Sequence, residues 1–308
     1  VKQCFDFQVT KGVTGLIAPI PLIENPEDEF TTQMKWIDVA LELSVNYNHP
    51  LYVTIPLLDE LIIHSEPENN LLIETILDQV GVRDGISGIY LLVMKSRESN
   101  IRITEKRTVK TLFLLSSEFA NSMGLSVLVN FVDDLGLFCL AAGAHYFGSA
   151  FWKKQKQIYA QDFIDRTGGR RYPRFYSAKL LADFRSEDDL DRLQEAKLLH
   201  LFDDDHTEAS TDLFNAFKAE RKPGTVPTWQ QTVNNDTAAN LHRVLRLTAA
   251  AEEMNSSEDK LGLALKWLQE AEMRVNYLRD RFHEDPLGEN FQHLNVWRSA
   301  FEEFLETC

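Results

Sequence analysis

The chain is poor in cysteine and has no long apolar run. Its three cysteines (Cys4, Cys139 and Cys308) are far apart and odd in number. We therefore expect no disulfide framework, no Cys-x-x-Cys zinc site and a reducing compartment, the cytoplasm. No stretch of about 18 apolar residues occurs, so no transmembrane helix is expected. The N-terminus VKQCFDFQ lacks a basic head before an apolar core, so no secretory signal is expected.

Several catalytic signatures are also absent. The sequence contains no GxSxG esterase motif, no HExxH zinc motif and no Walker A lysine loop. The segment LFDDDH (201–206) holds carboxylates and a histidine that could bind a metal. However, three adjacent residues on an extended strand cannot all face one ion, so we predict no metal and no cofactor. The chain also lacks an initiator Met, as expected of a trimmed chain or a piece of a longer protein.

The overall composition is that of a globular protein with a strong acidic balance. Hydrophobic residues make up 44% of the 308 residues and charged residues 26%, so a sizeable core can be buried. The formal net charge of −15 opposes non-specific binding to nucleic acid. Any contact with a polyanion would have to run through a local basic patch.

One segment, residues 151–180, contradicts this acidic balance. It contains eight Lys or Arg residues against two Asp, with seven aromatic residues interleaved. Basic side chains neutralise phosphates and aromatic faces stack on bases, which favours a nucleotide or nucleic-acid partner bound by residues 151–176. A solvated loop or a landing site for an acidic partner are the alternatives. The expected binding residues are Lys153, Lys154, Arg170, Arg171, Tyr172 and Arg174, together with Asn130 from another part of the chain.

Short apolar runs alternate with amphipathic segments up to about residue 202. Continuous apolar runs of this kind are typical of parallel strands buried on both faces. No Gly-rich phosphate loop follows the first run, so we predict an α/β fold of the (β/α)8 (TIM) barrel type rather than a dinucleotide-binding sheet. The two strands still needed for closure would come from the N-terminus and from 198–204. The six expected strands are 14–22, 50–58, 87–95, 125–132, 144–151 and 174–181, with helices near 26–47, 68–80, 103–123, 134–143 and 186–200.

The pattern changes after residue 205, where Lys222-Pro223-Gly224 and Pro227 break the chain. Three helices are expected near 236–254, 257–283 and 287–306, the second and third each with an apolar face. We therefore predict a barrel domain at 1–206 and a helical C-terminal extension at 207–308. The extension would either cap the barrel or bind a protein partner or a second copy of the chain.

In a βα barrel, functional residues follow the carboxyl ends of the strands. Asp133 and Asp134 follow the fourth run, where two carboxylates could divide general-acid and nucleophile roles. Capping of the next helix is the alternative for this pair. A single Asp of the run Asp203–Asp205, after the apolar step Leu201-Phe202, is a candidate nucleophile or base. The other residues expected at strand ends are Asp59, Glu60, Lys95, Asn130, Lys153, Lys154 and Asp183.

The run SAKLLADFRSEDDLDRLQEAKLLHLFDDDHTEA (177–209) resembles the late barrel of tRNA-guanine transglycosylases. In that family a Pro-Glu-Asp-Leu helix start precedes a hydrophobic-Phe-Asp step that carries the nucleophile. Arg185–Leu190 is similar to the helix start without its proline, and Leu201-Phe202-Asp203 is similar to the catalytic step. The resemblance implies that Asp203 attacks the ribose C1′ and that a base is released. Asn240-Leu241-His242 opens a helix much as the family's zinc-ligand histidine does.

The chain departs from that family in two features. The zinc cysteines are missing and no Asp-Ser-Gly-Gly signature occurs, so the resemblance is to divergent transglycosylase-like proteins that accompany bacterial antiviral operons. It implies a glycosyltransferase acting on a nucleobase, nucleotide or nucleic acid. Two competing hypotheses remain: a non-catalytic barrel that binds a protein partner, and an unrelated glycosidase or aldolase in which Lys95 would form a Schiff base.

Overall fold

The computed structural model describes residues 1–21, 26–64, 71–95, 102–151, 156–159, 173–231, 236–281 and 291–307. The chain divides into two compact units. Unit 1 comprises Val1–Ala150, Lys154–Ile164 and the C-terminal Thr307–Cys308, and unit 2 comprises Phe151–Lys153 and Asp165–Glu306. Unit 2 therefore begins well before the boundary at 206/207 that the sequence predicts.

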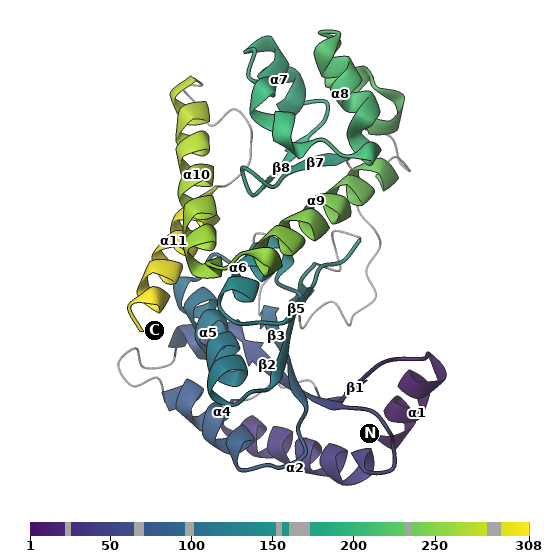
Figure 1. Ribbon diagram of the computed structural model, residues 1–308, viewed down its shortest axis with the longest axis vertical. Helices are drawn as coiled ribbons and strands as arrows, with labels where there is room; N and C mark the ends of the chain where they lie inside the picture. Colours follow the sequence, from purple (N-terminus) through teal and green to yellow (C-terminus); the bar gives the residue numbers. More distant parts are fainter. Residues whose placement is uncertain are drawn as a thin grey trace. The chain divides into compact units, whose positions relative to one another are not determined.

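Unit 1 is built on a parallel sheet whose first five strands lie in chain order, β1-β2-β3-β4-β5 (Figure 1). The sheet curls into a half-barrel, which confirms the predicted α/β class and parallel strands. The prediction of a closed eight-stranded barrel is wrong, because the remaining strands of the described chain do not extend this row. The strands are β1 (Leu16–Ile17), β2 (Leu51–Leu58), β3 (Gly88–Lys95), β4 (Ser126–Asn130) and β5 (Tyr146–Gly148).

A short sixth strand joins the sheet out of chain order. β6 (Ile158–Tyr159) pairs in parallel with the last two residues of β3, Met94 and Lys95. The pairing of β3 with β4 ends two residues earlier, at Leu92 with Asn130. β6 therefore pairs with β3 beyond the end of β4, where the carboxyl ends of the strands gather.

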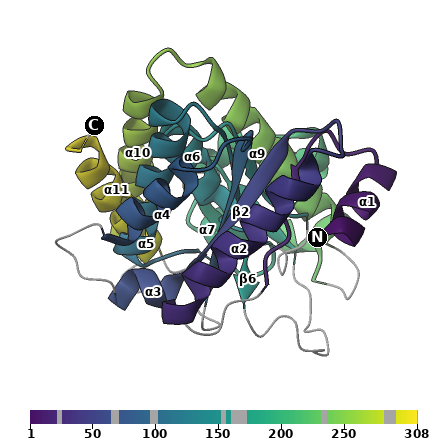
Figure 2. The same ribbon diagram turned by 90° about the horizontal axis from the view of Figure 1, so that it is seen from below.

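The sheet is stabilised by apolar side chains on both faces. On one face Val53, Ile55, Ile89 and Leu91 are 0–1% exposed, and on the other Leu92 and Met94 of β3 are 8% and 5% exposed. Figure 2 shows α2 running alongside β2, and both α2 and α3 contact that strand. The helices of unit 1 are α1 (Lys2–Thr10), α2 (Pro26–Ser44), α3 (Asp59–His64), α4 (Leu71–Gly81), α5 (Lys106–Ser117), the π-helix η1 (Glu118–Ser122), the 3-10 helix η2 (Asp133–Leu135) and α6 (Gly136–Ala141).

Unit 2 consists of an antiparallel hairpin and helices. Strands β7 (Arg174–Ser177) and β8 (Ala182–Arg185) pair with each other, and α9 packs against β7. Phe175, Phe184 and Phe202 form a fully buried aromatic cluster on this hairpin, with ring centroids 5.0–5.3 Å apart. The helices are α7 (Asp189–Glu195), η5 (Leu199–Asp205), η6 (Glu208–Ser210), α8 (Thr211–Lys218), η7 (Pro223–Thr225), η8 (Pro227–Trp229), α9 (Thr237–Ser256), α10 (Lys260–Arg281) and α11 (Gln292–Leu305).

Three of the expected strands have a different structure. The N-terminal segment is helix α1, because Phe5 buries one face of a helix rather than of a strand. The run 174–181 forms one strand of a hairpin and its turn, where Leu181 takes a left-handed φ of 50°. Residues 199–205 form the 3-10 helix η5. Among the described residues, no helix is long and apolar enough to cross a bilayer.

Candidate functional site

The carboxyl ends of three neighbouring parallel strands bring polar residues together in unit 1. Asp59 follows β2, Lys95 ends β3 and Asn130 ends β4. Asp133 comes three residues after β4, in the 3-10 helix η2. In open parallel sheets, ligands bind outside the carboxyl ends of the strands, so this edge is the candidate site.

Lys95 is the central cation of this edge. Its side chain is buried, and Nζ donates to the carbonyl of Arg102 and to Gln157 Oε1, each at 3.3 Å. Burial lowers the pKa of Lys95 from 10.5 to about 8, although the nearby carboxylates of Asp59 and Asp133 act in the opposite direction. A substantial share of Lys95 is therefore an uncharged amine slightly above neutral pH, the form that acts as a nucleophile or a base.

The backbone that leads from β4 to Asp133 is strained. Phe131 takes a left-handed φ of 60°, which a bulky aromatic residue rarely adopts, and Asp133 takes a φ of 52°, which Asp tolerates better than most residues. Asp133 is nevertheless buried, and Ser149 Oγ, just after β5, donates to its Oδ1 at 3.3 Å. Such strain is kept where the surrounding structure requires a side chain in one position. It fixes the Asp133 carboxylate beside the end of β3.

The neighbouring residues Asp134 and Asn130 serve the fold of this edge. Asp134 is fully buried in an ion pair with Arg102, with Nη2 and Oδ2 3.2 Å apart. Asn130 Nδ2 donates to the Tyr90 hydroxyl at 2.6 Å, and its Oδ1 accepts from the amide of Phe131 at 2.8 Å. Asn130 thus ties the end of β4 to the earlier part of β3, and Asp134 ties the segment after β4 to Arg102, so both side chains position the edge. Gly148 is required here because a Cβ would collide with the side chain of Asn130.

Sequence reasoning identified Asp59, Lys95, Asn130, Asp133 and Asp134 because each follows an apolar run. It missed Arg102 and Ser149, whose surroundings carry no motif. Tyr90 was missed because a tyrosine inside an apolar run normally indicates core. Nothing in the sequence of β3 indicates that the Tyr90 hydroxyl forms a hydrogen bond with Asn130.

The candidate nucleophile Asp203 lies in unit 2, on the 3-10 helix η5 rather than at a strand end. Asp203 and Asp204 are exposed, whereas Asp205 is fully buried. Asp205 accepts from Ser177 Oγ at 2.5 Å and from the amide of Ala178 at 3.0 Å, and it pairs with Arg246 at 3.2 Å. Burial raises the pKa of Asp205, although these partners lower it. Within the acidic run, the fold thus uses Asp205 to anchor the hairpin turn.

Asp183 and His242, both singled out by sequence, are buried in unit 2. Asp183 accepts from Arg243 Nη1 at 2.6 Å. His242 Nε2 donates to the carbonyl of Tyr176 at 2.8 Å, and Nδ1 lies 2.8 Å from Thr207 Oγ1. Burial lowers the pKa of His242 to about 4, so this ring is a neutral part of the core. The described residues contain no group of three His, Cys, Asp or Glu side chains that could hold a metal.

Most of the predicted basic binding segment falls outside the described residues, namely Lys153, Lys154, Arg170, Arg171 and Tyr172. Arg174 is described and lies partly exposed at the start of β7. Comparisons of the chain with protein-family models, with curated proteins and with solved structures find no match.

Proposed function

We propose that this chain is an enzyme that acts on a carbonyl substrate at the strand-end edge of unit 1, with Lys95 as the nucleophile. One observation carries the proposal: a lysine with a pKa of about 8 is buried at the end of the central strand beside two carboxylates. The strained backbone that holds Asp133 supports it. Asp133 or Asp59 would move protons during the reaction.

The chemistry is imine formation. The neutral amine of Lys95 adds to the substrate carbonyl carbon, and the carbonyl oxygen leaves as water after it receives protons from the amine and from a carboxylic acid. Because only one of the two protons on the departing oxygen comes from the amine, the product is a protonated imine, whose positive charge withdraws electrons from the neighbouring C–C or C–H bond, which can then break.

Borohydride trapping tests this proposal. Borohydride reduces an imine to a stable secondary amine, so incubation with pyruvate, dihydroxyacetone phosphate or glycolaldehyde should add the probe's mass to the peptide that contains Lys95. The adduct should disappear in Lys95→Met and remain in Lys35→Met, which removes an exposed lysine of α2. If no carbonyl probe labels Lys95 above the level of Lys35, the proposal is rejected.

A transglycosylase-like enzyme is the second candidate. It is favoured by the exposed position of Asp203 on η5 and by the similarity of residues 177–209 to that family. Asp203 would attack the ribose C1′, forming a glycosyl ester as the base leaves with its electron pair and gains a proton. The basic segment 151–176 would bind the phosphates.

A base-release assay with nucleosides, nucleotides and tRNA tests this candidate. Asp203→Asn should abolish release and Asp204→Asn, its exposed neighbour, should not. Replacing Arg170, Arg171 and Arg174 with Ala should weaken RNA binding and flatten its salt dependence. If neither release nor a carbonyl adduct is found, a non-catalytic scaffold is favoured, for which the exposed Met273 and Tyr277 of α10 offer a contact face.

A further inference from the structure

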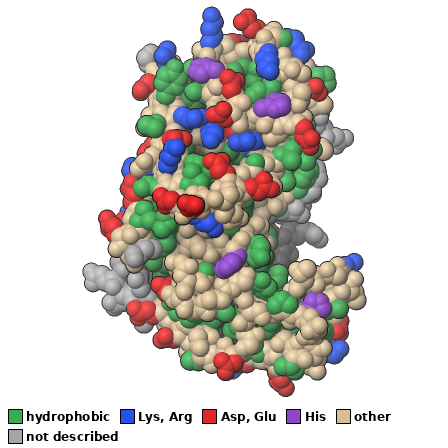
Figure 3. Space-filling view, in the orientation of Figure 1, with side chains coloured by type: hydrophobic (Ala, Val, Ile, Leu, Met, Phe, Trp, Pro, Cys, Tyr) green, Lys and Arg blue, Asp and Glu red, His purple; other side chains and the backbone are tan. Residues whose placement is uncertain are grey.

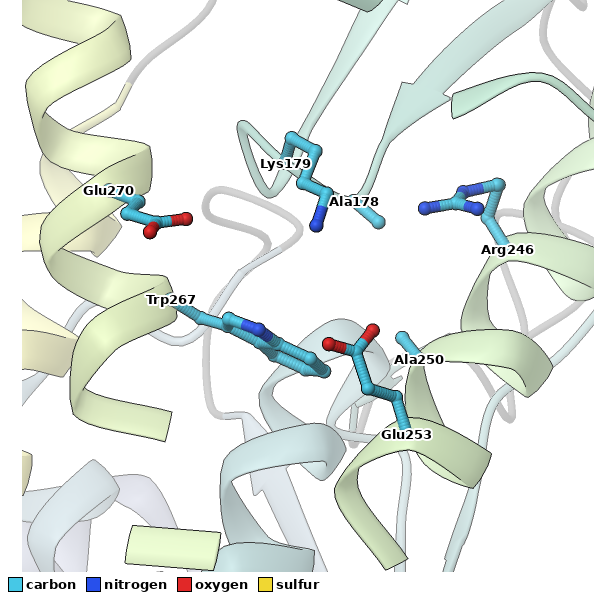
Figure 4. A pocket seen from close by; sticks show the side chains of 7 residues that line it. All are labelled: Ala178, Lys179, Arg246, Ala250, Glu253, Trp267 and Glu270. Carbon is cyan, nitrogen blue, oxygen red and sulfur yellow. The ribbon is translucent and has the colours of Figure 1, made fainter. Parts of the chain in front are cut away.

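Unit 2 contains a pocket where the hairpin turn, α9 and α10 meet (Figure 4). Its empty space of about 340 Å³ includes open solvent, so the pocket is an open recess rather than an enclosed cavity. The turn contributes Lys179, α9 contributes Arg246 and Glu253, and α10 contributes Trp267 and Glu270. Figure 3 shows Lys or Arg and Asp or Glu side chains side by side over this part of unit 2.

One side of the pocket carries positive charge. Arg246 is held in place by the buried Asp205, with Nη2 and Oδ1 3.2 Å apart, and Asp205 is in turn fixed by Ser177 and Ala178. Arg246 Nε is buried, and no described residue accepts a hydrogen bond from it. Lys179 also lies near Asp205 and forms no ion pair within the described part of the chain. Arg246 and Lys179 thus share the single carboxylate of Asp205. This leaves one positive charge and the Nε–H donor of Arg246 for an anionic group of a ligand.

The opposite side carries negative charge and an indole. Figure 4 shows the ring of Trp267 extending into the pocket toward Glu253, with Glu270 on the same helix as Trp267. Glu253 is exposed and has no ion pair within the described residues, while Glu270 has Lys266 of its own helix at 3.9 Å. An aromatic face beside carboxylates is the usual arrangement for binding an alkylammonium group.

We infer that this pocket binds a small zwitterion, an amino acid whose anionic group contacts Lys179 and Arg246 and whose ammonium group contacts Trp267 and Glu253. The site is independent of the strand-end edge of unit 1. An anion alone would face the two glutamates, and a cation alone would face the two basic residues. A ligand that carries both charges matches both sides of the pocket.

A length series of ω-amino acids tests the inference. The series contains glycine, β-alanine, 4-aminobutyrate, 5-aminovalerate and 6-aminohexanoate. Each is titrated by ligand-observed NMR at concentrations up to about 10 mM, so that ligands whose binding free energy is as weak as about −3 kcal/mol are still detected. One length should bind best, because the separation of the two sides is fixed. Butylamine and butyrate, which carry one charge each, should bind more weakly than 4-aminobutyrate.

Variants then assign the two sides. Lys179→Met, Glu253→Gln and Trp267→Leu should each weaken the best ligand about two- to fivefold. Glu252→Gln, an exposed neighbour on α9 outside the pocket lining, is the matched control and should bind as the wild type does. Absence of saturable binding across the series, or equal affinity in Glu253→Gln and Glu252→Gln, overturns the inference.

Discussion

Two of the buried basic side chains, Arg243 of unit 2 and Lys95 of unit 1, are held differently. In unit 2, Arg243 is 3% exposed, donates to Asp183 at 2.6 Å and lies 4.0 Å from the centre of the Tyr176 ring. In unit 1, Lys95 is 4% exposed, its contacts to Arg102 and Gln157 are 3.3 Å long, and burial lowers its pKa to about 8. A short ionic contact and an aromatic ring keep a charge in place for the fold. A buried lysine with a lowered pKa is suited to chemistry instead.

The largest effect is expected from removing the cation of unit 2. Arg243→Met leaves Asp183 buried without its ionic partner, so the free energy of unfolding should fall by about 3–5 kcal/mol. Urea unfolding followed by tryptophan fluorescence measures the change. The double variant Arg243→Met with Asp183→Leu should recover much of the loss, since no unpaired charge then remains. A single variant as stable as the wild type would contradict the structural role.

A smaller loss of stability is expected from Asp205 of η5, and it should distinguish this residue from its neighbour Asp203. Asp205→Ala removes the acceptor of Ser177, Ala178 and Arg246, so the free energy of unfolding should fall by about 2–3 kcal/mol. Asp203→Ala changes an exposed side chain and should stay within about 0.5 kcal/mol. Parallel urea titrations compare the two variants. Equal losses would mean that Asp203 has contacts beyond its exposed position.

The smallest effect is a pH-dependent gain in the free energy of unfolding on replacing Lys95, and it is also the sharpest test of the lowered pKa. Below pH 8 both folded and unfolded chains carry the proton, so the buried charge destabilises the wild type in full. Between pH 8 and 10.5 the unfolded chain binds more protons, so wild-type stability rises with pH. Lys95→Met should therefore be more stable than the wild type at pH 7 by about 2 kcal/mol, and this gain should shrink toward pH 10. Urea midpoints at pH 7–10, with Lys35→Met as control, measure it, and a constant difference would contradict the lowered pKa.

The sequence predicts the central strands well because burial on both faces requires continuous apolar runs. The runs 50–58 and 87–95 differ from β2 and β3 by one residue at one end. The same criterion fails at 174–181, because the turn after Ser177 contains Ala178, Lys179 and Leu180 rather than Gly or Asn-Gly. Because the sequence contains no residues typical of a turn there, strand β7 and the hairpin turn are predicted together as one parallel strand.

Strand-end reasoning places residues correctly when the predicted strand is present in the structure. It identified Asp59, Lys95 and Asp133 because β2, β3 and β4 are parallel neighbours. It misplaced Asp203 at a strand end because an apolar Leu-Phe step also occurs in a 3-10 helix that packs on an aromatic cluster. Ion pairs between distant residues, such as Arg102 with Asp134, depend on tertiary contacts and leave no trace in local spacing.

The pairing of β6 with β3 also bears on how the protein opens. β6 contributes two residue pairs, Met94 with Ile158 and Lys95 with Tyr159, across a long separation in sequence. Loop closure over such a distance costs entropy that two pairs offset weakly, so this contact belongs among the first cooperative units to open. Amides at 158–159 should therefore exchange their hydrogens faster than those of β2. Local dissociation of β6 from β3 would therefore expose the amine of Lys95 to solvent while the amides in the core of the sheet stay protected from hydrogen exchange.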